Sequence, residues 1–118
     1  MQFIKIDPTT RTIEAIETTG TLQEMYRQIG CQCIDFCVRH SNGDALVVDD
    51  EALLLDPQPE AFAFKGYPNR IHGIALVTGS DEEGETTAPI MTLEEVKQRV
   101  VWLGAVHTTA TLVFVPLS

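Results

Sequence analysis

The stretch that decides the predicted fold runs from Cys33 to Asp50 and reads CIDFCVRHSNGDALVVDD. Apolar side chains alternate with other residues in its first half, and an unbroken apolar run fills positions 45–48. Asn42 and Gly43 lie between the two halves. A tight type I′ turn needs positive φ at both central residues, so Asn-Gly between apolar runs is the strongest short-range signal of a β-hairpin. The stretch therefore predicts two antiparallel strands, although it indicates no reaction.

Size and charge limit the classes of function. A length of 118 residues with 44% hydrophobic residues predicts one globular domain over residues 1–118. The chain has 8 Lys and Arg against 17 Asp and Glu, which gives a formal net charge of −9. Nucleic acids and anionic membranes are bound by clustered Lys and Arg, so this balance argues against both as direct partners. There is no apolar run of the roughly 20 residues that span a membrane. Residues 1–5 read directly as the start of a strand, so we expect no secretory signal. We therefore expect a cytoplasmic protein.

Two strands and a helix are expected before the hairpin. Residues 3–7 and 11–18 predict two strands joined by a Pro-containing turn. Thr21 and Glu24 then match a capping box, in which the Thr hydroxyl accepts from an N–H of the first helical turn and the Glu reaches back. Gly30 is placed to end this helix in a left-handed conformation.

The second half of the chain predicts a buried strand, a helix and a final strand. Residues 71–78 are apolar on both faces, which is typical of a central strand. Residues 60–64 are compatible with one helical turn or with an extended segment, and residues 79–87 form a polar, acidic loop. A helix is expected over 92–103 and a strand over 108–116.

The expected second helix has its own capping and burial signals. Thr92 and Glu95 repeat the capping box. The expected buried stripe consists of Leu93, Val96, Val100 and Leu103. The order of elements along the chain predicts an α+β fold, with a mostly antiparallel sheet of five to six strands and two helices packed on one side.

No motif indicates a catalytic residue, a cofactor or a metal. Phosphate-binding and hydrolase motifs are absent from the sequence. On one strand Cys33 and Cys37 would lie about 13 Å apart, too far for a disulfide or a shared zinc. We expect the three cysteines to be small buried side chains. The histidines lie far apart in the sequence, at His40, His72 and His107. We expect them at strand ends or on the surface, although the fold would still be able to bring them together.

Two acidic clusters stand out in the sequence. Neither has the alternating spacing of a calcium-binding loop. The simple interpretation is a solvated surface, and the functional one is an electronegative face that binds a basic protein partner. The first acidic cluster consists of Asp49, Asp50 and Glu51, and the second of Asp81, Glu82, Glu83 and Glu85.

A third group of residues is polar but not acidic. It collects several of the few basic side chains just before a buried strand, where a small anionic ligand such as a nucleotide would find hydrogen-bond donors. The alternative is an ordinary loop whose basic residues balance nearby carboxylates. This polar cluster consists of Lys65, Tyr67, Asn69, Arg70 and His72.

Three segments occur in the order seen in a known family. They are IKIDP at 4–8 with TIE at 12–14, NGDALVVDDE at 42–51 followed by PEA at 59–61, and IHGIALV at 71–77 with GSDEEGE at 79–85. Residues 3–85 thereby resemble a domain-of-unknown-function family found in phages, plasmids and other mobile elements. That family has an Asn where this chain has Gln58. A helix and strand over 91–117 are expected to be an addition to the shared region.

The leading interpretation is a non-catalytic binding protein that uses an acidic surface to bind a protein partner. The resemblance implies a mobile-element setting, in which the partner would be a basic nucleic-acid-binding protein or a host defence protein. The second interpretation is a small-ligand binder that uses the polar cluster. The third is a hydrolase or metal enzyme with a convergent His and carboxylate site. A homo-oligomer is also compatible with the predicted fold, because the edge strands of an open sheet can pair with those of a second copy.

Overall fold

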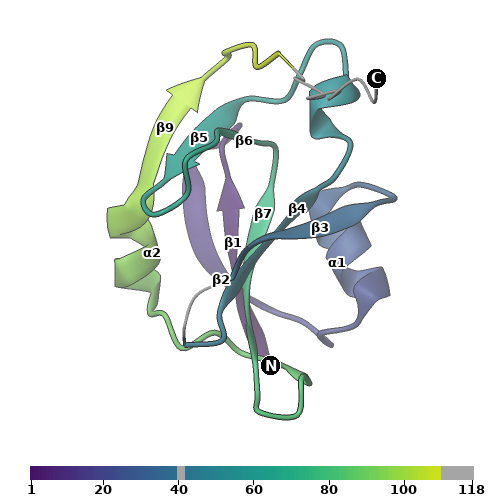
Figure 1. Ribbon diagram of the computed structural model, residues 1–118, viewed down its shortest axis with the longest axis vertical. Helices are drawn as coiled ribbons and strands as arrows, with labels where there is room; N and C mark the ends of the chain where they lie inside the picture. Colours follow the sequence, from purple (N-terminus) through teal and green to yellow (C-terminus); the bar gives the residue numbers. More distant parts are fainter. Residues whose placement is uncertain (40–41, 110–118) are drawn as a thin grey trace, which may run out of the picture.

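The computed structural model describes residues 1–39 and 42–109, which form an α+β fold (Figure 1). Within this part of the chain there are a main sheet of six strands, a second sheet of three strands and two α-helices. No helix among these residues is long and apolar enough to cross a membrane. In chain order the elements are β1 (Gln2–Asp7), β2 (Thr12–Glu17), α1 (Leu22–Ile29), β3 (Ile34–Arg39), β4 (Ala45–Asp49), the 3-10 helix η1 (Ala52–Leu54), β5 (Ala61–Phe64), β6 (Ile71–His72), β7 (Ala75–Ser80), β8 (Thr86–Thr87), α2 (Leu93–Arg99) and β9 (Val100–Gly104).

The main sheet is antiparallel at each of its strand pairs. Its order is β2-β1-β7-β4-β3, and the short β8 pairs with the end of β7. Val77 of β7 lies opposite Ile4 of β1 on one side and Leu46 of β4 on the other. The central strand expected in this region is therefore present, and its residues Ala75 to Gly79 are buried.

The hairpin predicted between Cys33 and Asp50 is confirmed. β3 and β4 pair antiparallel from Ile34 opposite Asp49 to Arg39 opposite Ala45, with a bulge at Cys37. The tip residues 40–41 lie outside the described residues. The bulge breaks the simple alternation of β3, because one extra residue is inserted between two consecutive pairs.

Helix α1 begins and ends where the sequence predicts. The Thr21 hydroxyl accepts from the Glu24 N–H at 3.2 Å, and Gly30 closes the helix at φ +77°. The Glu24 side chain departs from the predicted capping box. Its carboxylate accepts hydrogen bonds from the side chains of Arg27 and Gln28 on the next turn.

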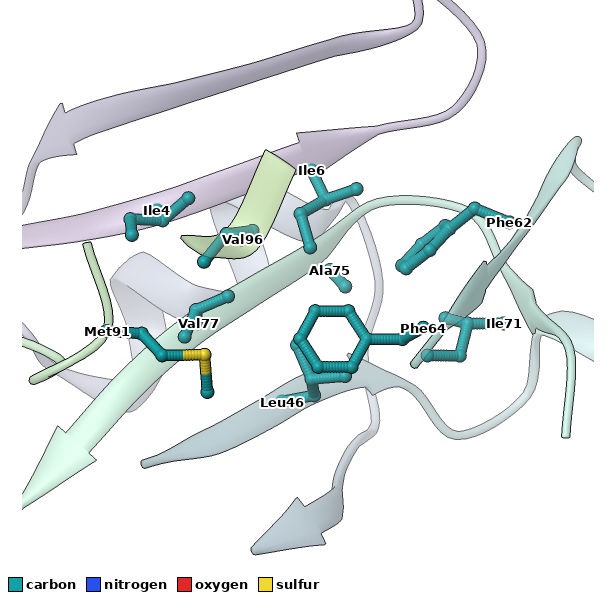
Figure 2. Close-up of a cluster of buried hydrophobic side chains, with 10 residues drawn as sticks. All are labelled: Ile4, Ile6, Leu46, Phe62, Phe64, Ile71, Ala75, Val77, Met91 and Val96. Carbon is teal, nitrogen blue, oxygen red and sulfur yellow. The ribbon is translucent and has the colours of Figure 1, made fainter. Parts of the chain in front are cut away.

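The two helices cover opposite faces of the main sheet, not one side as expected. Met25 of α1 packs with Phe3 on one face, whereas Val96 of α2 packs with Ile4 and Ile6 on the other. Figure 2 shows this second face, with the side chains of the second sheet closing the same cluster. Because β1 carries apolar side chains on both faces, both need a cover.

The second sheet divides a segment that the sequence predicts as one strand. Gly73 at φ +84° breaks residues 71–78 into β6 and β7, which belong to different sheets. β6 pairs with β5, so residues 61–64 take the extended alternative that the sequence left open. The prediction of one continuous strand over 71–78 is therefore wrong.

Helix α2 is shorter than predicted. Thr92 caps it as expected, accepting from the Glu95 N–H at 3.2 Å. The helix ends at Arg99, and the chain continues directly into β9, which pairs with β5. Val100 and Leu103 therefore lie in a strand and not on the helical stripe. Residues 110–118 of the expected strand over 108–116 lie outside the described residues, and Thr108 and Thr109 are not in a strand.

Candidate functional site

A cleft of about 200 Å³ lies where the β3–β4 hairpin meets η1 and the chain leading into β6. It combines residues of the first acidic cluster with residues of the polar cluster, which are separate in the sequence. Its lining consists of Asp35, Cys37, Val48, Asp49, Asp50, Ala52, Leu53, Tyr67, Arg70, Ile71 and His72.

The acidic side of the cleft is fixed by the base of the hairpin. Asp35 of β3 lies opposite Val48 of β4, one residue before Asp49. The Asp49 carboxylate accepts from the Glu51 N–H at 2.9 Å, and the Asp50 N–H donates to the Cys33 carbonyl at 3.0 Å. Asp35, Asp49 and Asp50 all line the cleft. Glu51 of the predicted cluster does not line it.

Asp35 is a residue that the sequence analysis missed. Its sequence neighbours are the apolar Ile34 and Phe36, so it is not part of an acidic cluster in the sequence. The hairpin register places it opposite Val48, another residue of the cleft lining, and residues directly opposite in an antiparallel pair project from the same face.

The polar side of the cleft holds Tyr67, Arg70 and His72. The exposed Arg70 guanidinium donates to the His107 carbonyl at 3.2 Å. His72 is buried, with Nδ1 2.8 Å from the Pro59 carbonyl oxygen and Nε2 2.7 Å from the Thr108 hydroxyl. A carbonyl oxygen only accepts, so Nδ1 carries a hydrogen. Both ring nitrogens are thus engaged in joining segments of the chain.

Two members of the predicted polar cluster lie elsewhere. Lys65 and Asn69 do not line the cleft. Lys65 lines a separate surface hollow beside α2, and its N–H donates to the Arg99 carbonyl at 2.8 Å. The structure therefore brings Tyr67, Arg70 and His72 of the predicted cluster to one cleft, without Lys65 and Asn69.

The cleft also contains a thiol that the prediction did not include. Burial raises the pKa of Cys37 to about 11, and the nearby Asp35 carboxylate acts in the same direction. Cys33 is exposed, contrary to the expected burial, and a hydrogen bond to Glu51 is the largest cause that raises its pKa. Burial is the largest cause of the raised pKa of Cys31. All three thiols are free and are protonated at neutral pH, which makes them weak nucleophiles and weak metal ligands.

The carboxylates of the cleft form no ion pair with any described side chain. Over residues 1–39 and 42–109 the ion pairs are Met1 with Glu17 and Arg27 with Glu24. Three aspartates and one arginine line the cleft, so its formal charge is negative. Within the same residues, no group of three or more His, Cys, Asp or Glu side chains is arranged to hold a metal ion.

The second acidic cluster lies at the other end of the main sheet. It forms the turn between β7 and β8, far from η1 along the long axis (Figure 1). The Asp81 carboxylate accepts from the N–H groups of Glu83 and Glu85, both at 2.9 Å, which stabilises this turn. The two acidic clusters therefore do not merge into one face.

A protein-family model matches a part of the chain that includes every residue of the cleft. A family model described as Domain of unknown function (DUF3846) matches residues 1–100. The chain belongs to this family. The match extends beyond the expected 3–85 and takes in α2. Comparisons with curated proteins and with solved structures give no match.

Asp44 is a second residue of the family region that the sequence analysis did not single out. Its buried carboxylate accepts from the N–H groups of Ile90 at 2.8 Å and Met91 at 2.7 Å. It thereby joins the hairpin to the segment that leads into α2. A polar residue after Asn-Gly was visible in the sequence, but its distant backbone partners were not.

Proposed function

We propose that this protein is a non-catalytic binding domain whose cleft receives a basic side chain of a protein partner. The observation that carries the proposal is the meeting of Asp35, Asp49 and Asp50 at one cleft, without an ion pair to any described side chain. A Lys or Arg of a partner would supply the missing positive charge. Charge complementarity of this kind raises association rates and selects partners.

The size of the cleft supports a side chain better than a whole metabolite. Its volume of about 200 Å³ is below the roughly 300–1,000 Å³ of most small-molecule sites. Arg70 stands at the rim and would orient an incoming carbonyl or carboxylate of the same partner.

The state of the reactive groups supports a binding role. Both nitrogens of His72 bond to other parts of the chain, and the Cys37 thiol is protonated at neutral pH. Acid-base catalysis by this imidazole or nucleophilic catalysis by this thiol would need the group free and activated.

The proposal also includes a cellular location and a class of partner protein. We place the protein in the cytoplasm of a cell that carries a mobile element. We propose as its target a basic protein, either one that binds nucleic acid or one that acts in host defence. The formal net charge of −9 supports such a target, because it favours encounter with basic surfaces.

Fluorescent peptides that contain arginine test the role of the cleft. We expect the double variant Asp49→Asn/Asp50→Asn to weaken their binding by about tenfold or more. The matched control is Glu82→Gln/Glu83→Gln, which removes the same formal charge at the other end of the sheet. Equal weakening by the two double variants would show that the overall charge, and not the cleft, binds the peptides. That result would contradict the proposal.

A small anionic ligand such as a nucleotide is the second candidate. The convergence of Tyr67, Arg70 and His72 at one cleft favours it. A thermal-shift screen against nucleotides tests it, because a ligand at 100 times its Kd adds about 2.7 kcal/mol of stability. A shift that Arg70→Gln abolishes would support this candidate. Unchanged melting with every nucleotide would contradict it.

A further inference from the structure

An apolar groove lies directly beside the cleft. It has a volume of about 520 Å³, with residues 53–58 on one wall and residues 105–107 on the other. Leu53 lines both the groove and the cleft, so the two hollows are adjacent. Leu54 is 72% exposed and Leu55 is 49% exposed. The groove therefore presents two consecutive leucines to solvent.

One side chain holds the two walls of the groove in place. The Gln58 amide nitrogen donates to the Leu53 carbonyl at 3.0 Å and to the Thr108 carbonyl at 2.8 Å. Its amide oxygen accepts from the Thr108 N–H at 2.9 Å. Arg70 binds the second wall as well, through the His107 carbonyl. A groove with bonded walls is preformed, which lowers the ordering cost of binding.

The surroundings of the groove favour an occupant that is both apolar and basic. Single exposed leucines are ordinary, but adjacent ones along a fixed groove mark an interaction surface. Asp56 lies among the groove residues, and Leu53 is shared with the cleft that Asp35, Asp49 and Asp50 line. A segment that fills both hollows needs apolar side chains next to a positive charge.

We propose that the groove binds apolar side chains of the same partner segment whose basic residue enters the cleft. This inference rests on the proposed function and adds a second requirement to it. The partner is then recognised by a Lys or Arg followed closely by apolar residues. The positive charge of the partner segment binds in the cleft and thereby positions the segment. Burial of its apolar side chains along residues 53–55 supplies the contact area.

Fluorescence anisotropy with the full chain and three synthetic peptides tests this requirement. The first peptide carries an arginine followed by two leucines, the second replaces the leucines by serines, and the third replaces the arginine by citrulline. We expect the first to bind at least about tenfold more tightly than the other two. Leu54→Ser/Leu55→Ser should remove this advantage, whereas the control Ile90→Ser, at a residue 68% exposed elsewhere, should not.

The outcomes separate this inference from the proposed function. Equal binding of the arginine peptides with leucines and with serines would overturn the groove and leave the cleft intact. Equal binding of the citrulline peptide would overturn the cleft. Tighter peptide binding by Phe114→Ser would show that residues 110–118 occupy the groove. A dimer that Leu54→Ser dissociates would assign it to a second copy. Each of the last two results would overturn the partner segment as occupant.

Discussion

The Nε2 atom of His72 lies 2.7 Å from the hydroxyl oxygen of Thr108, across 36 residues of chain. The other ring nitrogen bonds to the Pro59 carbonyl at 2.8 Å. One buried imidazole thus joins the loop before β5, strand β6 and the segment after β9. The contact fixes the back of the cleft and the start of the groove wall at once.

Removing this imidazole should destabilise the fold. We expect His72→Ala to lower the free energy of unfolding by about 2–4 kcal/mol, because it deletes two hydrogen bonds and leaves a cavity. Urea denaturation followed by circular dichroism measures the change. Thr108→Val removes only one of the two bonds and should cost about 1 kcal/mol. Equal losses in the two variants would show that the ring contributes nothing beyond its contact with Thr108.

The buried carboxylate of Asp44 should also be important for stability. Asp44→Ala leaves the N–H groups of Ile90 and Met91 without their acceptor, and we expect a loss of about 3 kcal/mol or more. Asp44→Asn retains one acceptor and should lose less. Glu82→Gln, at an exposed position, serves as the control and should change stability by less than about 0.5 kcal/mol. Unfolding of Asp44→Ala at the wild-type urea concentration would contradict this role.

The raised pKa of Cys37 predicts slow alkylation and a loss of stability at high pH. Its thiol should react with iodoacetamide about tenfold faster per pH unit until the pH approaches its pKa of about 11. Peptide mass spectrometry distinguishes it from Cys31 and Cys33. The unfolded thiol ionises near its ordinary pKa of 9.0, below the folded value. The stability linked to Cys37 is therefore complete below pH 9 and is lost as the pH rises toward 11. Cys37→Ser should lack this loss, and an unchanged pH profile would contradict the assignment.

The Glu24 carboxylate should contribute to the free energy of unfolding in a way that changes with pH in the acid range. The Arg27 guanidinium, helped by Gln28, lowers the pKa of Glu24 from 4.5 to about 2. A depressed carboxyl pKa stabilises the fold above pH 4.5, and this contribution is lost as the pH falls toward 2. We expect the difference in unfolding free energy between the wild type and Glu24→Gln to shrink over this interval. Denaturation series at several pH values measure it, and a constant difference would exclude the contribution.

Elements with local signals could be predicted from the sequence. Asn42-Gly43 specifies a turn by its own backbone preferences, and Thr21 and Gly30 specify the two ends of α1. Each of these signals acts within a few residues, so no knowledge of distant partners is needed. The α+β class followed correctly from such signals.

Features that depend on long-range pairing could not be predicted. Residues 71–78 are mostly apolar, and the positive φ at Gly73 lies where they divide between two sheets. Val100 fits a helical stripe as well as a strand, and its pairing with Phe64 decides for β9. The cleft has the same origin. Its acidic and polar sides were both visible in the sequence, but their meeting at one cleft depends on how the hairpin and the chain leading into β6 fold against each other.

The Gln58 amide bonds to the main chain of residue 108 and not to its side chain. Every amino acid except proline offers that same N–H and carbonyl pair. Position 108 also lies beyond the last matched residue, 100. The Gln58 anchor therefore tolerates any side chain but proline at position 108, whereas the contact of His72 Nε2 with the Thr108 hydroxyl selects a hydroxyl there.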